Sequence, residues 1–270
     1  MRFATIRIEK RLCGARVEND RVVLLDARDA VEAWAAGGHL PETGELSAAE
    51  AHFARVSPTP AHILCVGLNF RSHIAQLGYP IPEYPTLFAK FSSTLTGPRD
   101  VIVLPSVSEH IQGEVELAVI VGRRLQRAKA TEAAAAIAGY TVANDLSMRD
   151  WQHRSNESLQ GKVFDRSTPL GPILVTPDEV DHARDLQLSF HVDGVQWQSG
   201  STSDMVFPPA ELLSYCSQFM TLERGDVILT GTPAATSLAS DIHGGSLLVT
   251  AIEGLGKTIN PTRDDDAPAS

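Results

Sequence analysis

The sequence predicts an α+β fold that is mainly β, and two observations support this. Short apolar runs bounded by Gly and Pro recur along the chain, and helical patterns are few. After residue 59 the runs typical of strands are "DVIVLP", "EVELAVIVG", "GPILVTP", "LQLSFHVDGVQWQ", "DVILTGTP" and "SLLVTAIEG". Because these strands do not alternate with helices, the pattern argues against a doubly wound parallel sheet.

The chain divides into a small N-terminal α/β module, residues 1–58, and a larger domain, residues 59–260. In the module, "RFATIRI" and "ARVENDRVVLL" alternate as strands do, and "DARDAVEAWAAGG" has the spacing of a short amphipathic helix. The prolines of "VSPTPAH" mark the boundary. The acidic tail, residues 261–270, is expected to be disordered.

Two helices are predicted in the larger domain. One begins near residue 129 in "KATEAAAAIAGY", with Thr131 as a plausible N-cap, and the other begins at residue 208 in "PPAELLSYCSQFM".

Composition narrows the range of partners. The net charge of -10 and the absence of a basic stripe argue against nucleic-acid binding. No apolar run approaches the roughly 20 residues that a membrane span needs, and the N-terminus lacks the apolar core of a signal peptide, so we expect a cytoplasmic protein. Cys13, Cys65 and Cys216 are too widely separated to indicate a disulfide framework or a cysteine zinc site.

Two like charges stand out in "HIQGEVELAVIVG", residues 110–122. Glu114 and Glu116 are two positions apart in a strand pattern, so their carboxylates emerge on the same face. Buried without compensation, such a pair is costly, because desolvation and mutual repulsion both disfavour the ionised form. A positive charge between them is therefore expected.

A third carboxylate can reach this pair. Asp145 ends an apolar run 29 residues after Glu116, and a helix followed by a returning strand fits that gap. Three carboxylates with no Cys or His favour Mg²⁺, Mn²⁺ or Ca²⁺ over zinc. The alternative from spacing alone is that Glu114 and Glu116 line a solvated strand face and Asp145 caps a turn.

Seven stretches of the chain resemble the fumarylacetoacetate hydrolase family. They are "ILCVGLNFRSHIAQLG", "YPTLFAKFSSTLTGP", "GEVELAVIVG", "GYTVANDLSMRDWQ", "GKVFDRSTPLGPILVTPDEV", "TSDMVFPPAELLSYCSQFMTLERGDVILTGTP" and "IEGLG". The resemblance implies a mixed β-roll fold, commonly a homodimer, and a metal-dependent enzyme that acts on acylpyruvates, β-diketo acids or related 2-oxo or enol acids. Mg²⁺ is the implied cofactor, with Mn²⁺ or Ca²⁺ as alternatives.

The resemblance also assigns roles to single residues. Glu114, Glu116 and Asp145 match the family's metal-binding carboxylates. Arg149 and Gln152 match its contacts to the substrate carboxylate and oxygens, Lys162 matches its lysine near the metal, and Thr232 matches a substrate-contacting threonine. Without the resemblance, Arg149 could pair with Asp150 or Glu157, Lys162 could be solvated, and the Gly-Thr-Pro turn could be purely structural.

His73 matches the family's general base, which takes a proton from water whose attack on the distal carbonyl breaks a C–C bond. Family hydrolases usually carry a glutamate three residues later, but this chain has Gln76, which can orient an imidazole without supplying charge. Glu83, on the following proline-bounded loop, could fold back to replace that charge when substrate orders the loop; the alternative is a solvated loop glutamate. Arg166 also stands where the family commonly has threonine.

Three functions remain open at this stage. The leading hypothesis is a metal-dependent hydrolase that cleaves a C–C bond in an acylpyruvate or β-diketo acid. Because of Gln76, decarboxylation or keto–enol isomerisation of a 2-oxo acid on the same metal site is a serious alternative. A non-catalytic protein that binds metal and ligand is the third.

Overall fold

The computed structural model describes residues 1–237 and 239–265. The helices are α1 (Ala30–Ala35), α2 (Arg71–Leu77), α3 (Ala130–Ala134), α4 (Arg149–Gln152), α5 (Leu159–Lys162) and α6 (Pro209–Phe219), with short 3₁₀ turns η1 (Ser92–Thr94), η2 (Pro177–Ala183) and η3 (Thr202–Asp204). The strands are β1 (Arg2–Ile8), β2 (Arg11–Glu18), β3 (Arg21–Leu25), β4 (Glu42–Ser47), β5 (Phe53–Ala54), β6 (Ile63–Gly67), β7 (Thr86–Lys90), β8 (Leu95–Thr96), β9 (Ile102–Leu104), β10 (Ile111–Gln112), β11 (Val115–Val121), β12 (Ile137–Asn144), β13 (Ser147–Met148), β14 (Thr168–Val175), β15 (Gln187–Val192), β16 (Val195–Ser201), β17 (Val227–Leu229), β18 (Leu247–Ile252) and β19 (Gly256–Asp264).

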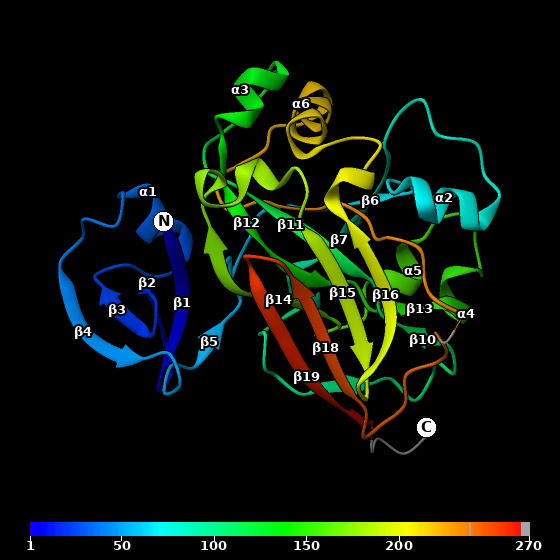
Figure 1. Cartoon of the computed structure of the whole chain (residues 1–270), viewed down its shortest axis with the longest axis horizontal. Helices are drawn as coiled ribbons and strands as arrows, with labels where there is room; N and C mark the ends of the chain where they lie inside the picture. Colours follow the sequence, from blue (N-terminus) through cyan, green and yellow to red (C-terminus); the bar gives the residue numbers. More distant parts are fainter. Residues whose placement is uncertain (238, 266–270) are drawn as a thin grey trace.

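The largest sheet joins the N-terminal module to the rest of the chain. Its strand order is β4-β3-β2-β1-β14-β12-β11-β17-β6-β7, with β5 beside β1 and β8 beside β14. The module forms a lobe of its own at the left of Figure 1. Strand β1 nevertheless pairs antiparallel with β14, so hydrogen bonds cross between the lobe and the main body.

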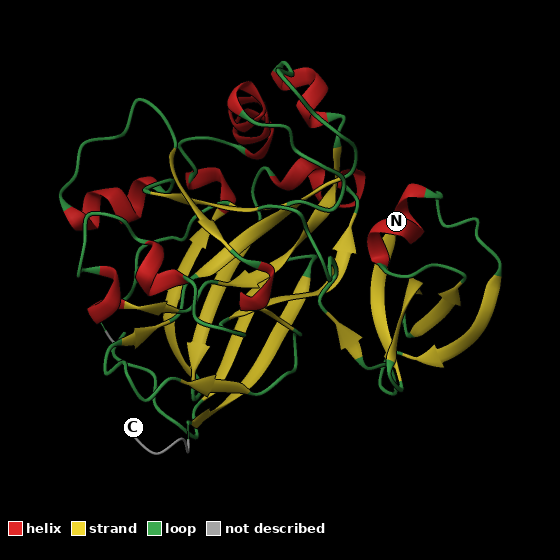
Figure 2. Ribbon diagram, turned by 180° about the vertical axis from the view of Figure 1, so that it is seen from behind, coloured by secondary structure: helices red, strands yellow, loops and turns green. Residues whose placement is uncertain are grey.

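A second, five-stranded sheet lies against β11, β12 and β14, with the order β16-β15-β18-β19-β9 (Figures 1 and 2). This sheet corrects the expected tail, because residues 261–264 belong to β19, where Thr262 pairs with Ile102 of β9. The acidic composition suggested disorder, but Asn260 and Thr262 are buried and pairing satisfies their backbone. Residues 266–270 of the expected tail lie outside the described residues.

The helix predictions are confirmed for α1 and α6 and need correction for α3. Helix α3 has Lys129, not Thr131, at its N-cap, and the alanine-rich run passes into β12 at Ile137. Local propensity favours helix there, but every residue of β12 is buried between β11 and β14, and that burial outweighs a propensity difference of under about 1 kcal/mol per residue.

The predicted mainly β, α+β fold is confirmed. The central strands β11 and β12 are buried along their whole length and pair antiparallel, with Val115 opposite Asn144. Such burial on both faces explains why β11 is a continuous apolar run interrupted only by Glu116. Among the described residues, no helix is long and apolar enough to cross a membrane.

Candidate active site

Three carboxylates meet where β11 begins and β12 ends. Glu114 immediately precedes β11, Glu116 lies within it, and Asp145 immediately follows β12. The antiparallel register places Asp145 beside Glu114, whose carbonyl accepts a hydrogen bond of 2.9 Å from the Asp145 amide. One oxygen from each of the three carboxylates lies within 4.8 Å of the others, and all three residues are buried.

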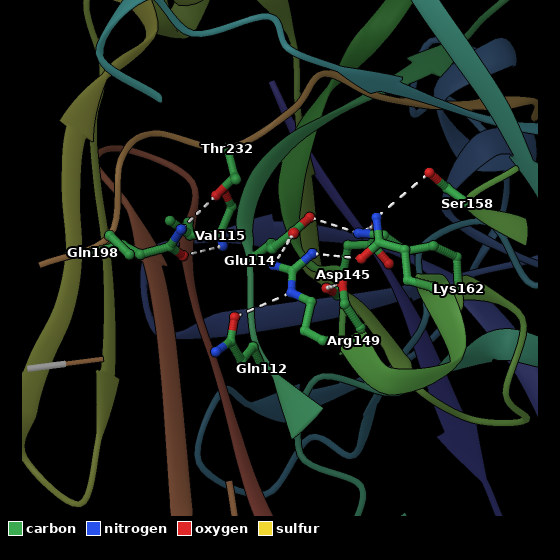
Figure 3. A network of polar contacts seen from close by, with 12 residues as sticks. Gln112, Glu114, Val115, Asp145, Arg149, Ser158, Lys162, Gln198 and Thr232 are labelled. Carbon is green, nitrogen blue, oxygen red and sulfur yellow. Dashed lines mark hydrogen bonds and ion pairs between the residues drawn. The ribbon is translucent and has the colours of Figure 1, made fainter. Parts of the chain in front are cut away.

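Lys162 and Arg149 supply positive charge to Glu114, one member of the glutamate pair (Figure 3). The cation expected between Glu114 and Glu116 is replaced by these contacts to Glu114 and Asp145. The Lys162 ammonium lies 2.7 Å from Glu114 and 2.8 Å from Asp145, and only 2 % of this lysine is exposed. The Arg149 guanidinium donates to Glu114 at 2.5 Å. Neither residue is a solvated surface cation, and Arg149 forms its ion pair with Glu114 rather than with Asp150 or Glu157.

A third cation, Lys90, was not anticipated as a site residue. It ends β7, is buried, and forms an ion pair with Asp145. Its sequence signal is a lysine inside the apolar run "LFAKF", which is weak because strand lysines commonly face solvent. The site therefore holds three carboxylates and three cations.

Gly161 allows the two short helices of the site to approach closely. A Cβ on Gly161 would lie 2.5 Å from Cβ of Gln152 and 2.6 Å from the carbonyl oxygen of Met148. The glycine thus lets α5 pack against α4, which brings Lys162 at the end of α5 beside Arg149 at the start of α4. Gln152 accepts a 2.8 Å hydrogen bond from Arg149, as expected of neighbours in one site.

The pKa values of the two glutamates shift in opposite directions. Burial alone would raise the pKa of Glu114, but the charges of Lys162 and Arg149 and their hydrogen bonds lower it well below its usual range. Glu116 shows the opposite direction: burial, then the charges of Asp145 and Glu114, raise its pKa. The Glu116 carboxylate accepts a hydrogen bond from the amide of Gly231, at 2.6 Å.

These residues fit a divalent cation. A carboxylate that lacks a cationic partner and has a raised pKa is the group that a bound cation would hold ionised. The donor atoms are all carboxylate oxygens, which Mg²⁺, Mn²⁺ and Ca²⁺ prefer over softer ligands.

Thr232 lies in the loop after β17, at the opposite edge of the site from Lys162 (Figure 3). Its hydroxyl donates to the carbonyl of Val115 at 2.8 Å and accepts from Gln198 at 2.9 Å. Gln198 also accepts from the amide of Val115 at 2.8 Å. The Thr232 hydroxyl is therefore engaged with β11, and Gln198, which sequence reasoning missed, fixes this loop to the strand.

His73 lies on α2, which is at the same end of the sheets as α4 and α5 in both Figures 1 and 2. The imidazole is half-buried, and burial lowers its pKa from the ordinary value of 6.5; Glu114 opposes this shift, and Arg149 and Lys162 add to it. Its Nδ1 is buried without a hydrogen-bond partner among residues 1–237 and 239–265.

The sequence singled out three further residues, Gln76, Glu83 and Arg166. Gln76 acts on the imidazole, because its side-chain hydrogen bond raises the pKa of His73, and its amide is also bonded to the backbone of Ala235 in the loop after β17. Glu83 is exposed on its loop, and its movement toward His73 on substrate binding stays a prediction. Arg166 pairs with Asp100 at 3.1 Å.

The fold and the site define a class: mixed-sheet enzymes with a buried carboxylate cluster suited to a divalent cation. The chain belongs to the fumarylacetoacetate hydrolase family, since residues 62–263 match the family model described as "Fumarylacetoacetate (FAA) hydrolase C-terminal". Members of this family include proteins named as hydrolases, isomerases and tautomerases.

Named relatives illustrate this range. The chain is 42% identical over 221 residues to human "Oxaloacetate tautomerase FAHD2A, mitochondrial", an alignment covering 80% of this chain and 70% of the relative. It superimposes on a 2-hydroxyhepta-2,4-diene-1,7-dioate isomerase from Mycobacterium marinum with a TM-score of 0.83 at 29% identity, covering 99% of this chain and 100% of that one. The fumarylacetoacetate hydrolase from Exiguobacterium antarcticum gives a TM-score of 0.87 at 27% identity, with 98% and 100% covered.

Proposed function

We propose that this protein is a divalent-metal-dependent keto–enol tautomerase of small 2-oxo dicarboxylic acids, the class to which oxaloacetate belongs. The observation that carries the proposal is the setting of His73, a half-buried imidazole with a lowered pKa and an unpartnered Nδ1. The name of the human relative supports the same class of reaction.

His73 suits a reaction that moves one proton out and back. In tautomerisation a neutral base takes a proton from C3 of the 2-oxo acid, the C2 oxygen gains a proton, and the C2–C3 bond becomes double. A lowered pKa keeps the imidazole neutral and able to accept that proton at neutral pH. Hydrolysis would require, besides this proton transfer, a water molecule that attacks a carbonyl and a C–C bond that breaks.

Arg149 is suited to hold the substrate carboxylate next to the carbonyl. Its guanidinium donates to Gln112 at 3.1 Å, to Gln152 at 2.8 Å and to Glu114, which fixes the plane of the fork. Each terminal nitrogen carries a second N–H beyond these bonds, so the guanidinium has further donors for a substrate carboxylate.

Lys162 is suited to stabilise the enolate oxygen. Burial alone would lower the pKa of its ammonium, but Asp145 and Glu114 raise it above its ordinary value, so the group stays charged. A fixed charge in a buried site stabilises developing negative charge without reorganising. A divalent cation held by Glu114, Glu116 and Asp145 would supply further positive charge that polarises the 2-oxo group.

The test follows product identity and rate in the same assay. The protein is mixed with enol-oxaloacetate and with a panel of acylpyruvates, each with Mg²⁺ or with EDTA, and the reaction is followed by stopped-flow absorbance and mass spectrometry. We expect Mg²⁺-dependent enol–keto exchange without a change in mass, slowed about 10²- to 10⁴-fold in His73→Asn. Faster C–C cleavage of an acylpyruvate, or faster loss of CO₂, would replace tautomerisation by hydrolysis or decarboxylation.

The proposal also covers the localisation, the oligomeric state and the partners of the enzyme. We propose a cytoplasmic homodimer that takes a small-molecule acid as its partner and binds neither nucleic acid nor a membrane. The net charge of -10 supports the last two points. Light scattering coupled to size-exclusion chromatography tests the dimer, since a mass near 29.1 kDa would mean a monomer.

A further inference from the structure

The loop that follows β17, residues 230–235, is held by side chains from several distant elements. Asn69 donates to the carbonyl of Thr230 at 2.8 Å, and Glu116 accepts from the amide of Gly231. Gln198 donates to Thr232 and to the carbonyl of Pro233. The loop is therefore a rigid reference point beside the carboxylate cluster.

Gln76 joins α2 to the end of this loop through both atoms of its amide. Its Nε2 donates to the carbonyl of Ala235 at 2.8 Å, and its Oε1 accepts from the amide of the same residue at 3.1 Å. Two antiparallel strands form the same pair of hydrogen bonds between the amide and carbonyl of facing residues, and here the Gln76 side chain takes the place of one strand. Only a group with one donor and one acceptor side by side can make it.

Helix α2 needs such an anchor. It has only seven residues, and no side chain caps its N-terminus at Phe70. Its one buried side chain is Ile74, and the amide of Ser72 is satisfied by Asp204 at 2.9 Å. A helix this short has little stability of its own, so its position depends on contacts like these.

We infer that Gln76 is a positioning residue: its amide clamps α2 to Ala235 and thereby fixes His73 relative to the carboxylate cluster. Glutamate at this position could pair with the Ala235 amide but would repel the Ala235 carbonyl, so it would release the clamp. The side chain at position 76 therefore decides between two arrangements. Glutamine fixes the helix and leaves His73 neutral, whereas glutamate would be a carboxylate free to pair with the imidazole. The role of His73 in this inference rests on the proposed function; the clamp itself does not.

The test compares Gln76→Glu and Gln76→Met with wild type, and uses Gln126→Glu as the control. Gln126 is exposed between β11 and α3, so this change adds the same charge away from the site. Hydrogen exchange measured by mass spectrometry should be about 3- to 30-fold faster in peptides covering α2 in both Gln76 variants, and unchanged in the control. The kcat for tautomerisation should fall about tenfold or more in both, with KM little changed, because Arg149 still holds the substrate.

The outcomes separate the clamp from the proposed function. Unchanged exchange in both Gln76 variants would overturn the clamp, whatever the activity. Faster exchange with unchanged kcat would overturn the positioning role. A gain of C–C hydrolysis in Gln76→Glu, with a raised His73 pKa by NMR and unchanged exchange, would show that residue 76 acts on the imidazole instead. If wild type lacks tautomerase activity the proposed function fails, and the exchange data still decide the clamp.

Discussion

The Lys162 ammonium lies between the carboxylates of Glu114 and Asp145, at 2.7 Å and 2.8 Å. The two carboxylates lie next to different strands, Glu114 just before β11 and Asp145 just after β12, and the lysine comes from a short helix 17 residues beyond Asp145. Glu114 can therefore be buried at the start of β11, because its charge is balanced by a fixed cation rather than by solvent.

Lys90 provides a test of this charge balance. Lys90→Met keeps the apolar length of the side chain but leaves the buried Asp145 with one cation fewer. Without metal, the free energy of unfolding should fall by up to about 3–5 kcal/mol, the usual cost of breaking a buried ion pair. Urea denaturation in EDTA measures this, with Lys10→Met on an exposed turn as the control. A loss below about 0.5 kcal/mol would mean that Lys162 alone balances the charge of Asp145.

Glu116 should contribute more to the affinity for a divalent metal than to the stability of the folded protein. Glu116→Gln removes a ligand charge but keeps the side-chain volume, so affinity for Mn²⁺ should drop at least about 10- to 100-fold by calorimetry. Because its folded pKa is raised above 4.5, wild type loses stability as pH rises from 4.5 through the folded pKa, and the amide avoids this loss. The metal-free variant should thus be as stable as wild type or more stable at pH 7. Unchanged Mn²⁺ affinity would remove Glu116 from the metal site.

Arg149 should act on substrate binding through the shape of its fork. Arg149→Lys keeps the charge but loses the bidentate geometry and the bonds to Gln112 and Gln152. We expect kcat/KM to fall about 10- to 150-fold, which corresponds to about 1.5–3 kcal/mol for a charged hydrogen bond. Steady-state kinetics on enol-oxaloacetate measures this, and kinetics equal to wild type would place the substrate carboxylate elsewhere.

His73 should make stability depend on pH in the acidic range. Its folded pKa is lowered from 6.5, so the unfolded chain binds the proton more readily. The stability that His73 contributes is complete above pH 6.5 and is lost as pH falls from 6.5 through the folded pKa. Urea denaturation between pH 5 and pH 8 should show a steeper acid loss for wild type than for His73→Asn, because other groups titrate alike in both. Parallel curves would mean that the pKa of His73 is not lowered.

The sequence by itself determined the fold class and indicated the candidate metal ligands. Strand periodicity puts Glu114 and Glu116 on one face and an antiparallel return can bring Asp145 back to them, but spacing alone left a solvated strand face open, and the family resemblance favoured the cluster. Helix α6 followed from its pattern in the same way, whereas the alanine-rich run after Lys129 did not, because burial between two strands outweighed its helical propensity.

Only the tertiary structure decided which cations balance the carboxylates and which backbone groups Gln76 binds. Lys90 meets Asp145 across 55 residues, and Gln76 meets Ala235 across 159, so no local period relates either pair. The residues 261–264 became a strand because β9 offered a partner to their backbone, although their composition favours disorder. Sequence patterns report which face a side chain takes within its own element. The partner across the fold depends on how distant elements pack, and for Gln76 that packing adds the backbone of Ala235, which no sequence pattern indicated.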